Sequence, residues 1–204
     1  MPQKLSVFDP LKMDYDMMRN VYGIVYENFM ELDAEKKVVL NIANSMKFDN
    51  ETKSWEFYIR RGIKWHGTET EVNAYDVEYT MQRIMAENTP YTRTLKNAVK
   101  SFEVLDLYRI KITAIDEGIM TLYALNFPVI SKEYNATELK NGEMPKGTGA
   151  YRLDNIKDEN GRKKLELVIN DKWWKKKPNI SKVICVGVQD ERDAIKLVGD
   201  GTLD

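Results

Sequence analysis

Apolar residues recur at helical spacing in three stretches of the chain, which predicts three amphipathic helices. The positions are Met18, Val21, Tyr22, Val25, Tyr26 and Phe29, then Val77, Met81, Ile84 and Met85, and finally Ala194, Leu197 and Val198. Asn73, answered by Asp76 three residues later, is a capping signal for the second helix, and Asp190 precedes the third. A further short helix is predicted over 119–125, before Asn126-Phe127-Pro128.

Between these helices the pattern changes to the two-residue period of strands. Trp55, Phe57 and Ile59 alternate with polar neighbours, and a strand is also expected over 104–114. The segments 151–156 and 164–169 flank Asn160-Gly161, a dipeptide typical of hairpin turns. The continuous apolar run 183–188 predicts a strand that is covered on both faces. Helices and strands therefore mix along the whole chain, which indicates an α/β protein.

The composition is that of a globular protein with balanced charge. The chain has 204 residues, with 31 Lys and Arg against 32 Asp and Glu, so its net charge is -1. The absence of a basic excess argues against a nucleic-acid partner. The basic run Lys175-Lys176-Lys177 is interpreted as a solvated surface turn. The single cysteine, Cys185, lies in an apolar run and is interpreted as a small core residue.

No catalytic or metal-binding set can be assembled from the residues. His66 is the only histidine, so a zinc site built from several histidines is excluded, and no Gly-x-Ser-x-Gly elbow is present. We expect no enzymatic activity and no cofactor, and we interpret His66 as a turn residue with local bonds. Gly147-Thr148-Gly149 is expected to be a turn where backbones approach closely. Trp173-Trp174 is expected to pack in the core rather than to stack on a ligand.

Short motifs follow one another in an order that matches a known family. They are Phe8-Asp9-Pro10, Tyr26-Glu27-Asn28-Phe29, 42–46, 57–67, 73–77, Thr89-Pro90-Tyr91, 147–151, Asn170 with Trp173-Trp174, Lys177-Pro178 with Ile180, and 201–204. The order resembles that of the extracellular solute-binding proteins of family 5, the peptide/nickel class that includes oligopeptide- and dipeptide-binding proteins. Each motif is weak by itself, but their shared order makes the resemblance specific. Met46 and Ala150 depart from the family's usual Trp and Pro.

The resemblance implies a periplasmic-binding-protein-like fold of type II, of which this sequence holds the amino-terminal lobe and lacks the second. The expected lobe has a mixed sheet formed by residues 1–27 and 130–204 together. Residues 28–129 are expected to form an inserted α+β subdomain. In such proteins two lobes close on a ligand across a hinge.

The resemblance also places candidate ligand contacts. The segment after Asp-Pro runs along the bound peptide in peptide-binding members, and it matches Met13, Asp14, Tyr15 and Asp16 here. The tyrosine of Ser-Pro-Tyr lines the cleft, and Tyr91 matches it. A carboxylate at Asp14 would pair with a peptide ammonium group. For Asp14 and Asp16 the alternative is a helix cap ahead of Met17.

The function implied by the resemblance is ligand capture for an ABC importer, with peptides as the ligand and the permease subunits as partners. A nickel chelate, haem or an oligosaccharide remain alternative ligands, as does peptide sensing in signalling. The resemblance further implies a monomer outside the cytoplasmic membrane, in a periplasm or on the cell surface. Membrane association would come only through a lipid anchor or the permease.

Overall fold

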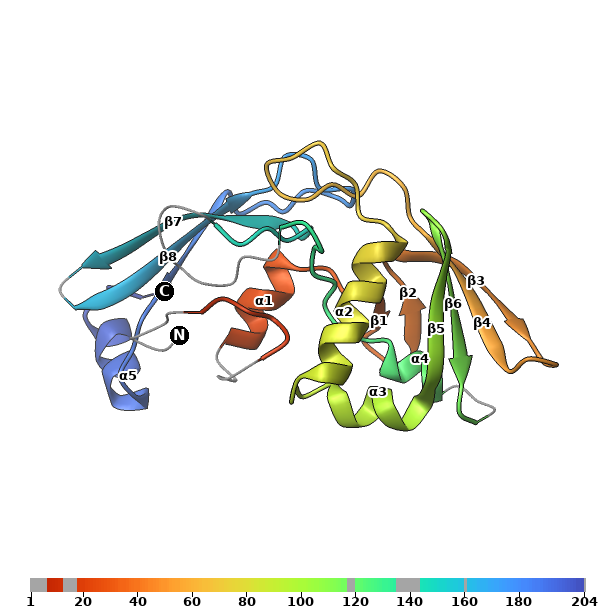
Figure 1. The fold of residues 1–204 in the computed structure, drawn as a ribbon. Coiled ribbons are helices and arrows are strands. Elements are labelled where there is room, and N and C mark those ends of the chain that lie inside the picture. The colour runs from red at the N-terminus through yellow and green to blue at the C-terminus, as the bar shows by residue number, and fades with distance from the viewer. Residues whose placement is uncertain (1–6, 13–17, 117–119, 135–143, 160, 204) are drawn as a thin grey trace.

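The computed structural model describes most of the chain. The described residues are 7–12, 18–116, 120–134, 144–159 and 161–203. The helices are α1 (Arg19–Val25), α2 (Ala74–Ala86), α3 (Thr92–Ala98), α4 (Met120–Ala124) and α5 (Glu191–Gly199). The strands are β1 (Met30–Leu32), β2 (Val38–Leu40), β3 (Ala43–Asp49), β4 (Ser54–Ile59), β5 (Val99–Asp106), β6 (Arg109–Ala114), β7 (Tyr151–Glu159), β8 (Arg162–Ile169) and β9 (Lys182–Val186). The elements form an arch in Figure 1, with β7, β8 and α5 at one end and β3 to β6 at the other.

The largest sheet has the strand order β3-β4-β6-β5, with antiparallel neighbours throughout. Its inner face carries Phe57, Ile110 and Ile112, all fully buried. Its outer face carries polar residues such as Glu56, which pairs with Lys111 across β4 and β6. This alternation is the expected pattern of a sheet with one face on the core and one in solvent, and it confirms the strand predicted around Trp55.

The second main sheet has the order β7-β8-β9, again antiparallel. The hairpin predicted around Asn160-Gly161 is confirmed by the β7–β8 pairing, and Gly161 has a φ of 72°. The prediction that 183–188 is covered on both faces is wrong. Strand β9 pairs only with β8, and the Ile184 side chain is 50% exposed. Val183 and Cys185 pack against the main core from one face of β9, whereas the face that carries Ile184 is open.

Two further predictions need correction. Every ladder between the named strands is antiparallel, so the mixed sheet expected for the lobe is not seen among the described residues. Strands that follow one another as sheet neighbours, such as β3-β4, β5-β6 and β7-β8, are joined by short turns, and such connections give antiparallel pairs. The single strand expected over 104–114 is two strands, β5 and β6, which turn at Leu107-Tyr108. Helix α3, directly before β5, was not predicted.

The helix starts follow the predicted caps. The Asn73 side chain accepts from the Tyr75 N–H at 2.9 Å, and Asp76 accepts from the Asn73 N–H at 3.0 Å, which completes the capping box of α2. Asp190 accepts from the Asp193 N–H at 2.9 Å and caps α5. Helix α1 ends at Val25, so Phe29 of the predicted face lies beyond the helix while remaining buried.

One main hydrophobic cluster holds the two ends of the arch together. It includes Phe8 and Val25 near α1, Phe57 and Ile112 of the large sheet, and Leu167 of β8. A smaller cluster lies under α5, where Leu197 packs with Val186 and Val188. In the described ranges, no helix has both the length and the apolar character needed to cross a bilayer.

Candidate functional site

The predicted ligand wall is only partly visible. Met13, Asp14, Tyr15 and Asp16 lie outside the described residues. Tyr91 is described, and it lies at the start of α3. The described residues before and after these positions are Asp9 to Lys12 on one side and Met18 on the other.

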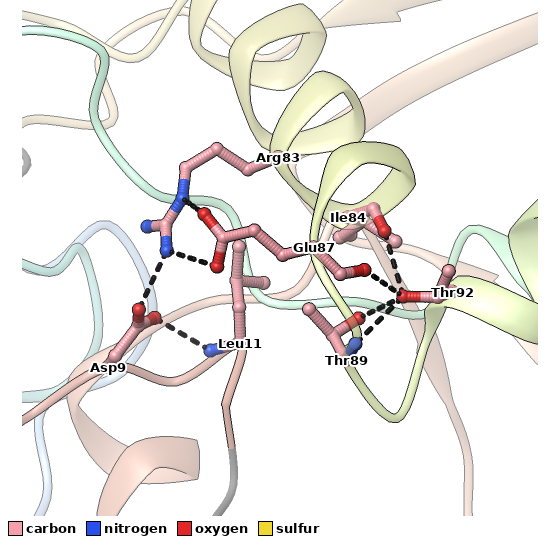
Figure 2. A network of polar contacts seen from close by, with 7 residues as sticks. All are labelled: Asp9, Leu11, Arg83, Ile84, Glu87, Thr89 and Thr92. Atoms are coloured by element: carbon pink, nitrogen blue, oxygen red, sulfur yellow. Dashed lines mark hydrogen bonds and ion pairs between the residues drawn. The ribbon is translucent and has the colours of Figure 1, made fainter.

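The turn before this segment is organised by Asp9, whose side chain is 1% exposed. One carboxylate oxygen accepts from the Leu11 N–H at 3.0 Å, and the Asp9 carbonyl accepts from the Lys12 N–H at 3.2 Å. The other carboxylate oxygen accepts from Nη2 of Arg83 at 2.8 Å (Figure 2). A buried carboxylate needs a partner charge, and Arg83 of α2 supplies it. This ion pair allows the Asp9 side chain to be buried in the turn.

Arg83 is itself fixed by the end of its own helix. Its Nε and Nη2 donate to the two carboxylate oxygens of Glu87, at 2.8 and 3.0 Å. The hydrogen bonds with Glu87, followed by the contact with Asp9, raise the pKa of Arg83, and the same guanidinium lowers the pKa of Glu87. Arg83 and Glu87 therefore stay ionised, and their bidentate geometry fixes the direction in which Arg83 reaches Asp9.

The turn that carries Tyr91 is held by the same end of α2. The Thr92 hydroxyl lies 2.8 Å from the carbonyl oxygens of both Ile84 and Glu87 (Figure 2). The Thr89 N–H donates to Thr92 Oγ1 at 2.9 Å, and the Tyr91 N–H donates to Thr89 Oγ1 at 3.2 Å. The last turn of α2 is thus the common support of the Asp9 turn and of the Tyr91 turn.

Tyr91 also lies near the start of α1. Burial raises the pKa of its hydroxyl, and the positive charge of Arg19, the first residue of α1, opposes that rise. An electrostatic effect of this kind requires proximity, so Tyr91 is close to the element that follows the 13–17 segment. The Tyr91 turn and the start of α1 therefore lie in the same region of the structure.

His66 lies in a turn, as predicted, but the prediction that its ring bonds locally is wrong. The side chain is buried, and the partners of its ring lie more than eighty positions away in sequence. Nδ1 accepts from the Gly147 N–H at 3.2 Å, so Nε2 carries the proton and donates to the Gly149 carbonyl at 3.0 Å. Burial lowers the pKa of His66 to about 4, which leaves the ring neutral. Both ring nitrogens are occupied by backbone groups, so the ring is not available as a base or as a metal ligand.

The two glycines that His66 holds lie against the end of α1. A Cβ atom on Gly147 would stand 2.0 Å from the Val25 carbonyl oxygen, and one on Gly149 would stand 2.5 Å from that of Ile24. The prediction that glycine here permits a close approach of backbones is confirmed. The contact fixes where the end of α1 lies against the 147–149 turn.

The tryptophan pair packs on charged side chains. Trp173 donates from Nε1 to Glu27 at 2.8 Å, and the ring of Trp174 has the Arg60 guanidinium 4.5 Å and the Lys175 ammonium 4.9 Å from its centroid. Lys175 also donates to Glu27 at 2.8 Å, so the prediction that this lysine is simply solvated is wrong. These cations occupy the Trp174 ring that a sugar would need for stacking.

Candidate metal and thiol chemistry can be assessed only in the part of the chain that the structure describes. There, no group of three or more His, Cys, Asp or Glu side chains is placed to hold a metal ion. Burial raises the pKa of the Cys185 thiol, which keeps it protonated, and it packs beside the main core as expected for a small apolar residue.

Sequence reasoning missed Arg83, Glu87 and Thr92, which hold the Asp9 turn and the Tyr91 turn. Arg83 and Glu87 stand four residues apart, a spacing that indicates an ion pair on a helix. The contact from Arg83 to Asp9 joins residues separated by 74 positions, and no local pattern points to it.

Comparison with known proteins then identifies the family. The family model described as bacterial extracellular solute-binding proteins, family 5 middle, matches residues 37–204. Di/tripeptide-binding protein 1 of Pseudomonas aeruginosa is 27% identical over 165 residues, which cover 68% of this chain and 30% of that protein. Heme-binding protein A of Haemophilus influenzae is 25% identical over 189 residues, 80% of this chain and 34% of that protein. The chain thus spans about a third of the length of these curated relatives.

Solved structures show the same fold. The binding protein MoaA of A. tumefaciens R10, in complex with mannopinic acid, has a TM-score of 0.82 at 19% identity, over 100% of this chain and 42% of its own. DppA of Helicobacter pylori with the peptide STSA has a TM-score of 0.79 at 20% identity, over 99% and 44%. NikZ of Campylobacter jejuni with Ni(L-His) has a TM-score of 0.79 at 19% identity, over 100% and 41%. The described structure is thus a mixed α/β portion of that fold, and the chain belongs to the bacterial extracellular solute-binding proteins of family 5, a family of binding proteins rather than enzymes.

Proposed function

We propose that this chain is the first lobe of a substrate-binding protein that captures peptides for an ABC importer. The observation that carries the proposal is the convergence of the Asp9 turn and the Tyr91 turn on the last turn of α2. A rigid support of this kind holds two short segments in one geometry, which a peptide wall requires. The curated relatives that are named for dipeptides and tripeptides support the ligand class.

The wall itself would be formed by Met13, Asp14, Tyr15, Asp16 and Tyr91. The backbone of these residues would offer donors and acceptors to a peptide, which is how peptide backbones are recognised without regard to their side chains. A carboxylate at Asp14 would hold the peptide ammonium group. Tyr91 would contribute an apolar ring, and its hydroxyl is protonated at neutral pH like that of an ordinary tyrosine.

The complete protein would have two lobes that close around the peptide. Residues 1–27 and 130–204 would form the core of the first lobe, and 28–129 the inserted subdomain. The contact of Gly147 and Gly149 with α1 would tie the two parts of the core together. The opposite wall of the cleft would belong to the second lobe.

The cellular location and the partners of the protein follow from the same proposal. The protein would act as a monomer outside the cytoplasmic membrane and deliver its peptide to the permease subunits. Any membrane association would come through the permease or through a lipid anchor. The family's description as extracellular supports the location.

A nickel chelate, haem and an oligosaccharide stay alternative ligands, because this chain would supply only part of the cleft and a heme-binding protein is among the curated relatives. We favour peptides because several of those relatives are named for dipeptides or tripeptides. Both ring nitrogens of His66 are engaged by Gly147 and Gly149, so His66 itself would not hold a metal in such a site.

The test is isothermal titration of the full-length protein with a mixed library of dipeptides to pentapeptides. Replacing the half-buried tyrosine ring, Tyr91→Ala, should weaken peptide binding by about tenfold, since the contact of one aromatic side chain with the peptide is removed. Tyr75→Ala is the matched control, because Tyr75 is exposed on α2 and belongs to neither turn of the wall. Absence of heat with every peptide, or equal weakening by both substitutions, would exclude the proposed peptide wall.

A further inference from the structure

An open depression of about 630 Å³ lies on the outer face of the large sheet, away from the proposed peptide wall. It is formed where β4 ends and where β5 turns into β6. Its lining residues are Asn44, Ser45, Tyr58, Ile59, Arg60, Arg61, Asp106, Tyr108 and Arg109. Strand β5 leads from α3, which carries the Tyr91 turn, to this depression, so the two regions lie at opposite ends of the strand (Figure 1).

Two of the lining arginines are held by aromatic rings. The guanidinium carbon of Arg60 lies 4.5 Å from the centroid of the Trp174 ring, and that of Arg61 lies 4.5 Å from the centroid of the Tyr108 ring. A guanidinium placed over a ring is attracted to it electrostatically, and this attraction needs no conventional hydrogen bond to its N–H groups. The rings therefore help to hold both arginines while their N–H donors stay available for an anion.

The donors of these arginines are largely uncommitted. Arg60 uses Nε to donate to the Asn41 carbonyl at 3.1 Å. Among the residues that the structure describes, no hydrogen bond or ion pair is recorded for its two Nη groups or for any nitrogen of Arg61. A guanidinium that is oriented but not paired is prepared to bind an oxyanion in a bidentate manner.

The single carboxylate of the lining does not cancel these charges. Asp106 accepts from Nε of Arg109 at 2.6 Å, and Arg109 also donates from Nη1 to Glu56 at 3.0 Å. The hydrogen bond from Arg109 lowers the pKa of Asp106, so these two groups and Glu56 form an ion network of their own. Glu71, outside the lining, accepts from the Tyr108 hydroxyl at 3.2 Å and from the Gly62 N–H at 2.9 Å. In the described residues neither Asp106 nor Glu71 forms an ion pair with Arg60 or Arg61, so both guanidinium groups keep donors for an anion.

We propose that this depression is a binding site for a phosphate group. Two planar guanidinium groups supply paired N–H donors, and the neutral groups of Ser45, Asn44 and Tyr58 line the same depression and match the remaining oxygens of a phosphate. The site is separate from the proposed peptide wall and does not depend on which ligand that wall takes. A free phosphate ester and the headgroup of an anionic lipid share this chemistry, and the experiment distinguishes them.

The test is titration of the 204-residue chain with inorganic pyrophosphate at low ionic strength, followed by calorimetry and by amide chemical shifts. In a parallel arm the protein is sedimented with phosphatidylglycerol vesicles and, for comparison, with phosphatidylcholine vesicles. Arg61→Gln should weaken binding by about tenfold, because a charge-assisted contact is lost. Arg61→Lys should recover only part of this, because an ammonium keeps the charge but loses the planar fork.

Arg192→Gln is the matched control, since it removes the same charge from an exposed position on α5. Binding of pyrophosphate that depends on Arg61 and not on Arg192 supports a site for free phosphate compounds. Binding of phosphatidylglycerol vesicles alone, with the same dependence, supports a lipid headgroup. Equal effects of Arg61→Gln and Arg192→Gln, no effect of Arg61→Gln, or no binding in either arm would overturn the proposal.

Discussion

The buried histidine makes a quantitative prediction about the pH dependence of stability. The pKa of His66 falls from 6.5 to about 4 on folding, because burial disfavours the charged ring. Between these values the unfolded chain binds a proton that the folded chain does not, so stability falls as the pH is lowered through this range. A proton on Nδ1 would also remove the acceptor of the Gly147 N–H.

The size of the effect follows from the two pKa values. Linkage gives a loss of about 2 kcal/mol in the free energy of unfolding between pH 7 and pH 4.5. Most of this loss falls below pH 6, where the unfolded-state histidine is already protonated. That amount is a large part of the stability of a domain of this size.

The assay is urea unfolding at a series of pH values from 7.5 to 4.5, followed by fluorescence. His66→Gln supplies the comparison, since an amide retains a donor and an acceptor but does not titrate. The carboxylates titrate in both proteins, so the difference between the two pH profiles isolates the histidine. If the free energies of both proteins change with pH in parallel, the reasoning about His66 is refuted.

Three further outcomes are expected. Gly149→Ala should destabilise the chain by about 1–3 kcal/mol, since its Cβ would stand 2.5 Å from the Ile24 carbonyl oxygen; a thermal midpoint equal to that of the parent would contradict the close approach. Asp190→Ala should cost about 1 kcal/mol through loss of the α5 cap, and Glu191→Ala much less; equal losses in urea unfolding would argue against capping. Residues 1–204 alone should bind peptides only weakly, because the proposed cleft needs a second wall; micromolar affinity in calorimetry would contradict a one-walled site.

The sequence predicted the local elements well where periodicity and caps agree. The capping box at Asn73 and Asp76 and the hairpin at Gly161 are both present, because these signals act over a few residues. The sequence predicted the elements less well where one follows another without a connecting turn. Helix α3 and strand β5 join at Ala98 and Val99 without a breaker, so only the later part of the strand was recognised.

The residues of the candidate site also fall into those that the sequence pointed to and those that it missed. The resemblance pointed to Tyr91 and to the segment after Asp9, and these remain the proposed wall. The residues that support the wall were not found, because Arg83 reaches Asp9 only after α2 has packed against the Asp9 turn. The role of His66 was also misjudged, since its partners Gly147 and Gly149 come close only in the folded chain.

By itself, the sequence determined the alternation of helices and strands, the glycines at Gly147 and Gly149, and the order of motifs that marks the family. These are properties of neighbouring residues, and they can be read without knowing the fold. Only the tertiary structure decided that β9 lies at an edge, that Arg60 and Arg61 are held over aromatic rings, and that His66 is neutral. Exposure, stacking and pKa depend on what surrounds a side chain, and those surroundings come from distant parts of the chain.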